Sequence, residues 1–146
     1  MKRIHQLVIV CVLALTACAP KAEEPAGAVL KVGYGTVSKT YTVDNLKALG
    51  ETQATFKGVT YLGVTLTALL QDAGIDPTNL TAVKAVSSDG FSANYDASLY
   101  AAEDTIVAYA TVDGPLTADD GTFRMVLPNG EGKMNVRQLV EIVAIP

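Results

Sequence analysis

After residue 28, apolar and polar residues alternate in several short segments, which is typical of half-buried β-strands. Seven or eight strands are predicted. Residues 105–112 are apolar on both faces and 139–145 are almost continuously apolar, so these two strands are expected at the centres of sheets. A turn-rich stretch around Tyr61, framed by glycines, is expected between two elements. The predicted strands are two within 29–42, with a turn near 33–36, and then 52–56, 82–87, 91–95, 105–112, 123–127 and 139–145.

Helical periodicity is clearest at residues 66–73, where apolar residues at i, i+3, i+4 and i+7 would form one buried face. Thr65 stands at the expected N-cap of this helix, and Thr42 does so for a shorter helix at 43–49. A helical turn is predicted at 96–101. Strands and helices do not alternate strictly, so we expect an α+β fold with mixed sheets and short helices.

The first 18 residues have the pattern of an export signal. Lys2 and Arg3 precede an apolar run at 7–15, which is shorter than the ~20 residues that a membrane-spanning helix needs. The run ends in the tetrapeptide Leu-Thr-Ala-Cys, which is similar to the lipobox of bacterial lipoproteins. We therefore expect a signal peptide at residues 1–17 and a lipid on Cys18. An ordinary signal peptide that contains a cysteine is the alternative.

The segment that follows is rich in Ala, Pro and Glu, so residues 18–27 are expected to be the lipidated cysteine and a flexible tether. Residues 28–146 would form one domain. Two acyl chains suffice for stable anchoring without a membrane-spanning helix. The expected location is therefore the cell membrane or the outer membrane, with the domain facing the periplasm or the exterior.

Export would also limit the chemistry of the protein. Loss of Lys2 and Arg3 leaves 9 basic against 15 acidic residues, a net charge of −6, which disfavours nucleic acid as a partner. His5 and Cys11 leave with the signal peptide, and Cys18 would carry the lipid. The mature chain then has no histidine and no free thiol. This excludes zinc or copper sites built on His or Cys, His-dependent nucleophilic triads and disulfides.

Six stretches of the domain occur in the order and spacing of a known family. They are VDNLKAL (43–49), GVTLTALL with AGI (63–75), SDGF (88–91), IVAY (106–109), DGPL (113–116), and a segment from a glycine through an arginine to LP (121–128). Together they resemble the oxidoreductase molybdopterin-binding domain, the fold of sulfite oxidases and their bacterial relatives, over residues 41–145. The resemblance implies a sulfite-oxidase-type molybdopterin-binding fold and makes molybdopterin a possible cofactor.

The chain departs from that family where the cofactor is held. Catalytic members carry a molybdenum-ligating cysteine near the position of residues 54–57, where this chain has Ala-Thr-Phe-Lys. A later family loop carries an arginine, a serine and a lysine for the pterin phosphate. Met134, Asn135 and Arg137 stand at those positions here, with Lys133 adjacent. The resemblance therefore implies a weakened anion site and no thiolate ligand.

We expect a ligand-binding or accessory module of the cell envelope, without catalytic residues, metal ligands or a bound cofactor. Its expected partners are the membrane, through the lipid on Cys18, and an envelope redox protein or a small anionic ligand. The alternative is a molybdopterin-dependent oxidoreductase, or a subunit of an envelope redox complex, which Arg137 and the glycine-rich loop at 129–132 favour. The resemblance implies a ligand-binding surface at the family pocket, and its candidate residues are Thr55, Lys57, Tyr61, Asp89, Tyr95, Lys133 and Arg137.

Each candidate also has a plainer interpretation. The tyrosines can be core residues with a hydrated hydroxyl, Asp89 a turn residue and the cations solvated loop charges. A purely structural role at the envelope stays open. A hydrolase based on the acidic pairs at 103–104 and 119–120 is disfavoured, because adjacent carboxylates in exposed loops seldom converge on one bond.

Overall fold

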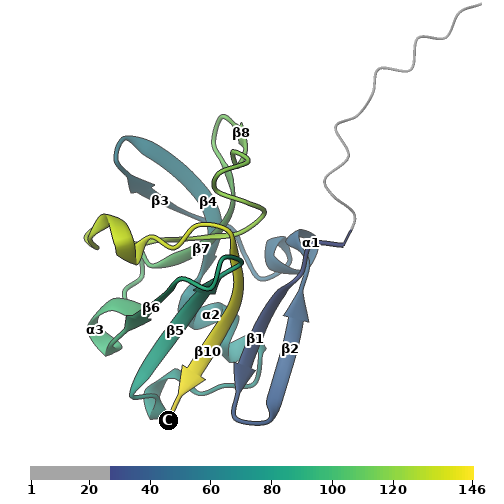
Figure 1. Cartoon of the computed structure of the whole chain (residues 1–146), viewed down its shortest axis with the longest axis vertical. Coiled ribbons are helices and arrows are strands. Elements are labelled where there is room, and N and C mark those ends of the chain that lie inside the picture. The colour runs from purple at the N-terminus through teal and green to yellow at the C-terminus, as the bar shows by residue number, and fades with distance from the viewer. Residues whose placement is uncertain (1–26) are drawn as a thin grey trace, which may run out of the picture.

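The computed structural model describes residues 27–146, and the predicted signal peptide and Cys18 lie outside the described residues. Ten strands of the described chain form two sheets of five strands each (Figure 1). The first sheet has the order β2 (Val37–Tyr41), β1 (Leu30–Tyr34), β10 (Leu139–Ile145), β5 (Ala82–Ser87) and β6 (Ser92–Tyr95). The second has the order β3 (Thr52–Phe56), β4 (Val59–Thr65), β7 (Ile106–Thr111) and β8 (Gly114–Pro115), with β9 (Arg124–Val126) also paired to β7.

Strand pairing agrees with the predicted fold class. β1 pairs with β10 in parallel, and the other pairs in both sheets are antiparallel. The predicted α+β fold with mixed sheets is therefore confirmed. The two strands predicted to be central are also confirmed as such, because β10 lies between β1 and β5 and β7 lies between β4 and its two other partners.

Three short α-helices, α1 (Val43–Lys47), α2 (Leu66–Asp72) and α3 (Ala97–Tyr100), and two 3₁₀ turns, at Pro77–Asn79 and Gly132–Met134, complete the described structure. The predicted caps are present. The Thr42 side chain accepts a hydrogen bond from the Asn45 backbone N–H. The Asn45 side chain in turn accepts a hydrogen bond from the Thr42 backbone N–H. Thr65 accepts from the Ala68 backbone N–H. Among residues 27–146 no helix is long and apolar enough to cross a membrane.

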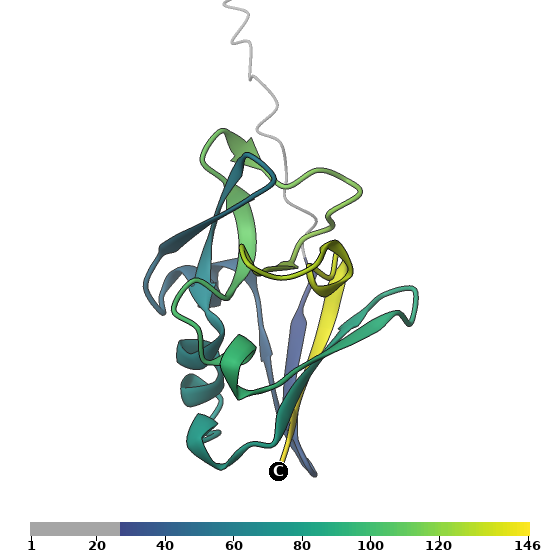
Figure 2. The same cartoon turned by 90° about the vertical axis from the view of Figure 1, so that its left-hand side faces the viewer.

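The main core lies between the two sheets and includes α2 (Figure 2). The apolar face predicted for this helix is buried, since Leu66, Leu69 and Leu70 have no exposed surface. Residues of β3, β4, β7 and β9 form a second, smaller apolar cluster. In it Tyr61 packs with Ile106 and Val126. Burial of these apolar side chains is the main favourable contribution to folding of the described chain.

The prediction of turn-rich structure around Tyr61 is wrong, because this residue lies within strand β4. Gly63, which suggested a turn, instead lets β4 pass close to β7. A Cβ at Gly63 would overlap the Val107 carbonyl group and lie 2.8 Å from the Ala108 Cα. Glycine inside a strand often marks such a close backbone approach. With β4 and the two-residue β8 added, residues 27–146 contain ten strands in place of the predicted seven or eight.

Candidate functional site

A cleft of about 630 Å³ opens beside the turn between β5 and β6. Three of the seven candidate residues, Asp89, Lys133 and Arg137, line it. Asp89 comes from a segment more than 40 residues before the loop that carries the other two. We call this site the polar cleft. Its other lining residues are Ser87, Phe91, Asp119, Gly132, Asn135, Val136 and Gln138.

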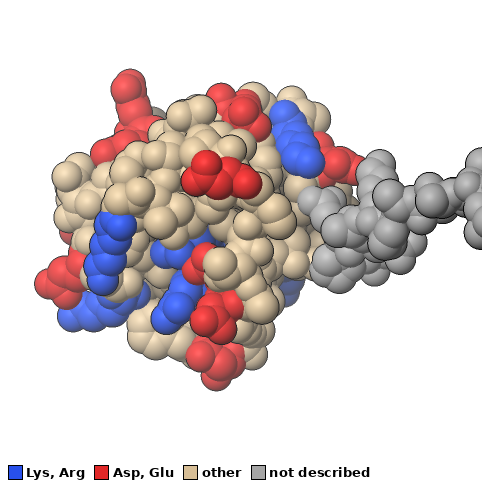
Figure 3. Space-filling view, turned by 90° about the horizontal axis from the view of Figure 1, so that it is seen from above, with Lys and Arg blue, Asp and Glu red and all other residues tan. Residues whose placement is uncertain are grey.

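The polar cleft carries charges of both signs. Lys133 forms an ion pair with Glu131 at 3.0 Å, but both side chains are more than two-thirds exposed, so the pair is weak. Arg137 is exposed as well. Asp89 accepts a hydrogen bond from the Phe91 backbone N–H at 2.9 Å, and this bond is the main cause that holds its pKa below the usual range. On the face seen from above, basic and acidic side chains lie close together in the lower part of the view (Figure 3).

Asn135, which lines the polar cleft, and Tyr95, which does not, both bind the loop that carries Lys133. The buried Asn135 amide accepts from the Leu127 backbone N–H at 2.8 Å and donates to the carbonyl groups of Leu127 and Glu131 at 3.2 and 3.1 Å. The Tyr95 hydroxyl donates to the Met134 carbonyl at 2.7 Å, and burial raises the pKa of this tyrosine. Both side chains therefore hold the loop that carries Lys133.

Gln138, which also lines the polar cleft, is positioned by a close backbone approach. Gln138 has a positive φ of 48°, and a Cβ at Gly121 would lie 2.8 Å from the Gln138 Cα. The Gln138 backbone N–H donates to the Asp120 carbonyl at 2.7 Å, and Ser88 Oγ donates to Gln138 Oε1 at 2.8 Å. These contacts fix the backbone at Gln138. The backbone of the preceding residue, Arg137, is therefore held in position beside the polar cleft.

The remaining candidates, Thr55, Lys57 and Tyr61, lie on the β3–β4 hairpin and do not line the polar cleft. The exposed Thr55 hydroxyl is 2.9 Å from that of Thr60. Lys57, at the turn, has a φ of 50°, and its Nζ lies 3.7 Å from the point that a Cβ at Gly132 would occupy. The hairpin tip therefore lies next to the loop that carries Lys133.

A buried cluster of charged and polar side chains was not predicted from the sequence. Arg124 Nη1 lies 2.6 Å from Asp120 Oδ1 and donates to the Tyr61 hydroxyl at 2.9 Å, and both charged side chains are almost fully buried. The Arg124 guanidinium also lies 4.5 Å from the centroid of the Tyr61 ring. The expectation that Asp120 is an exposed loop carboxylate is thus wrong. A single arginine within an apolar strand, four residues after an aspartate, was the available signal.

The residues present do not fit the thiolate-ligated molybdenum centre that catalytic members of the resembled family carry. The chain has no cysteine or histidine after Cys18. Within residues 27–146, no group of three His, Cys, Asp or Glu side chains could hold a metal ion. Near the position implied for the cysteine, the Thr55 hydroxyl pairs with Thr60, and the Asn135 amide at the implied serine position is engaged within its own loop. The described part of the chain therefore offers no thiolate ligand for molybdenum.

A family model for the oxidoreductase molybdopterin binding domain matches residues 29–146. Among solved structures, the chain is similar to the sulfane dehydrogenase SoxCD from Paracoccus pantotrophus, with a TM-score of 0.63 and 19% sequence identity. The match covers 80% of this chain and 38% of that one, so this chain spans less than half of the SoxCD chain it matches. No curated protein matches the sequence.

The structural match confirms the prediction of a sulfite-oxidase-type fold, and the family model supports the resemblance seen in the sequence. Because that model covers 29–146, far more than half of the 146 residues, the chain belongs to the oxidoreductase molybdopterin binding domain family.

Proposed function

We propose that this protein is a lipid-anchored module of the cell envelope that binds a small anionic ligand in the polar cleft and does not ligate molybdenum. The lipid on Cys18 would hold it at the membrane. The domain would present the polar cleft to the periplasm or the exterior. The observation that carries the ligand proposal is the convergence of Lys133 and Arg137 on one cleft of about 630 Å³.

The chemistry of the cleft supports a ligand with an anionic group and further donor groups. Arg137 can bind an oxyanion through two parallel N–H donors, and Lys133 can add a point charge. Asp89 and Asp119 would repel a bare anion but can accept hydrogen bonds from hydroxyl groups. A small phosphorylated or carboxylated polyol satisfies both requirements.

The second candidate is a molybdopterin-dependent oxidoreductase or a subunit of an envelope redox complex, which would take an envelope redox protein as partner. Family membership and Arg137 favour it. Loss of the soft ligand opposes it, because the high-valent molybdenum centre of this family takes a protein thiolate.

Metal analysis separates the two candidates. We expect the protein purified from a molybdenum-replete host to contain far less than one molybdenum atom per chain, with a cysteine-containing family member from the same host as the positive control. About one molybdenum per chain would reject the proposed function in favour of the redox candidate.

Ligand binding in the polar cleft is tested by titrating the exported protein with glycerol 3-phosphate and following ligand NMR signals. We expect saturable binding that Arg137→Gln weakens about tenfold, as loss of a charge-assisted bidentate contact should. Lys84→Gln, which removes a cation from strand β5, is the matched control. Equal weakening by both variants would indicate unspecific attraction and contradict the proposal.

A further inference from the structure

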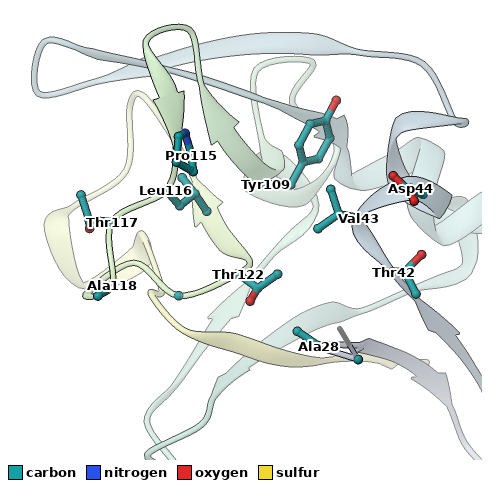
Figure 4. A pocket seen from close by; sticks show the side chains of 12 residues that line it. Ala28, Thr42, Val43, Asp44, Tyr109, Pro115, Leu116, Thr117, Ala118 and Thr122 are labelled. Atoms are coloured by element: carbon teal, nitrogen blue, oxygen red, sulfur yellow. The ribbon is translucent and has the colours of Figure 1, made fainter. Parts of the chain in front are cut away.

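A second cavity, of about 520 Å³, lies among α1, β7 and the loop after β8, next to the segment that precedes β1 (Figure 4). We call it the apolar pocket. None of the seven candidate residues lines it. It shares no lining residue with the polar cleft, and the proposed function does not use it. The residues that matter for its chemistry are Val43, Asp44, Tyr109, Pro115, Leu116 and Thr122.

The walls of the apolar pocket are mostly carbon. Figure 4 shows Pro115 and Leu116 on one side and Val43 on the other, with the Tyr109 side chain above Val43. Val43 and Tyr109 are 8% and 5% exposed, so their contact surfaces are set by the core behind them. Ligand pockets of this volume are typically apolar and hold one or two placed polar groups. An alkyl or aryl body is the group that these walls suit.

The charges around the apolar pocket favour a cationic head over an anionic one. Asp44 is the charged residue among those that line it, and neither lysine nor arginine is among them. The Tyr109 hydroxyl donates to Glu51 Oε2 at 2.9 Å, so a second carboxylate stands behind the aromatic wall. The neighbouring cation, Lys47, has its Nζ 5.8 Å from the centroid of the Tyr109 ring and is exposed.

From this combination we infer that the apolar pocket binds a small apolar amine, with its hydrocarbon body against Val43, Tyr109 and Leu116 and its ammonium group at Asp44. An anion of equal size meets Asp44 without a lining cation to offset it. The pocket should therefore discriminate by charge between ligands of the same shape.

The experiment compares two probes of nearly equal size and opposite charge, phenethylammonium and 3-phenylpropanoate. Binding to the full-length exported protein in zwitterionic micelles is followed by saturation-transfer NMR at pH 7, with empty micelles as the blank. We expect saturable binding of phenethylammonium, at least fivefold tighter than that of 3-phenylpropanoate. Asp44→Asn should weaken amine binding about threefold, the range of a partly exposed ion pair.

Two further variants locate the binding. Ala118→Phe places a ring at the pocket wall from an exposed loop position and should abolish amine binding, while an unchanged melting temperature shows that the fold is intact. Asp119→Asn removes a carboxylate from the polar cleft and should leave amine binding unchanged. The inference is overturned if neither probe binds saturably, if both bind equally, or if Asp119→Asn weakens the amine more than Asp44→Asn does.

Discussion

At the scale of single residues, two positions, Gly63 and Arg124, matter because of their contacts with residues of other segments. Gly63 has ordinary extended backbone, yet its missing side chain leaves room for β7. Arg124 belongs to an apolar strand, yet its charge is buried against Asp120 and Tyr61. In both cases a contact distant in sequence decides which residue the position tolerates.

Gly63→Ala should lower the free energy of unfolding by about 2–3 kcal/mol, because backbone atoms of β7 must move to admit the new Cβ. Gly33→Ala is the matched control, since a Cβ there would meet its nearest atom, the Val37 carbonyl oxygen, at 3.5 Å. We expect its effect to stay within about 1 kcal/mol. Urea denaturation measures both variants, and equal losses would contradict the close approach of β4 and β7.

Arg124→Met should cost about 3–5 kcal/mol of stability, because it leaves Asp120 buried without its partner. Adding Asp120→Asn to this variant should restore part of the loss, since the second change removes the unpaired charge. Urea denaturation of the wild type, the two single variants and the double variant gives the coupling free energy of the pair in a double-mutant cycle. If Arg124→Met is no worse than the surface change Arg137→Met, the buried pair does not stabilise the fold as described.

At the scale of elements, short helices are held by their caps and by ties to the sheets. The five residues of α1 and the seven of α2 are too few to be stable alone, so tertiary contacts supply the remainder. Asp72, at the end of α2, accepts hydrogen bonds from Lys39 Nζ at 2.6 Å and from the Tyr41 hydroxyl at 2.8 Å. These bonds join the helix to the edge strand β2.

This tie should make stability depend on pH in the acid range. Lys39, and then Tyr41, lower the pKa of Asp72 in the folded protein. The stabilisation is therefore complete above the unfolded pKa of about 3.9 and is lost as the pH falls through the lower folded value. The melting-temperature difference between wild type and Asp72→Asn should narrow from pH 6 to pH 2.5. A melting-temperature difference that stays constant with pH would contradict the stabilising role of the Asp72 hydrogen bonds. Asp113→Asn, at an exposed carboxylate, is the control.

At the scale of the whole molecule, two sheets around one core create two cavities of different chemistry. The polar cleft has charges of both signs, whereas the apolar pocket has carbon walls and one carboxylate. The main core extends from Leu30 to Ala144. Folding of the domain and its proposed attachment to a membrane are therefore separable properties.

Cys18→Ser should move the protein from the membrane fraction to the aqueous fraction, because the proposed diacyl anchor can no longer be attached. The melting temperature of the domain should change little, since the main core begins at Leu30. Fractionation and metabolic labelling with a palmitate analogue measure the two effects. Retention of the variant at the membrane, or a wild type without label, would contradict the anchor.

Local patterns predicted those features of the fold and candidate site that depend on neighbours in sequence. The spacing of Leu66, Leu69 and Leu70 sets the buried face of α2, and the hydroxyls of Thr42 and Thr65 cap the helices that follow them. The apolar runs of β7 and β10 likewise predicted central strands. At the site, the family resemblance selected Asp89, Lys133 and Arg137, which line one cleft, but it equally selected Thr55 and Tyr61, which do not.

By itself, then, the sequence determined the fold class, the caps, the central strands and the absence of thiol and imidazole groups after Cys18, because these follow from composition and local periodicity. Only the tertiary structure decided that Gly63 lies within a strand, that Asp120 is buried, and which charges share a cleft. These depend on which distant segments pair and on how closely their backbones approach. A periodic pattern shows which face of a strand is buried, but not which distant segment lies against it.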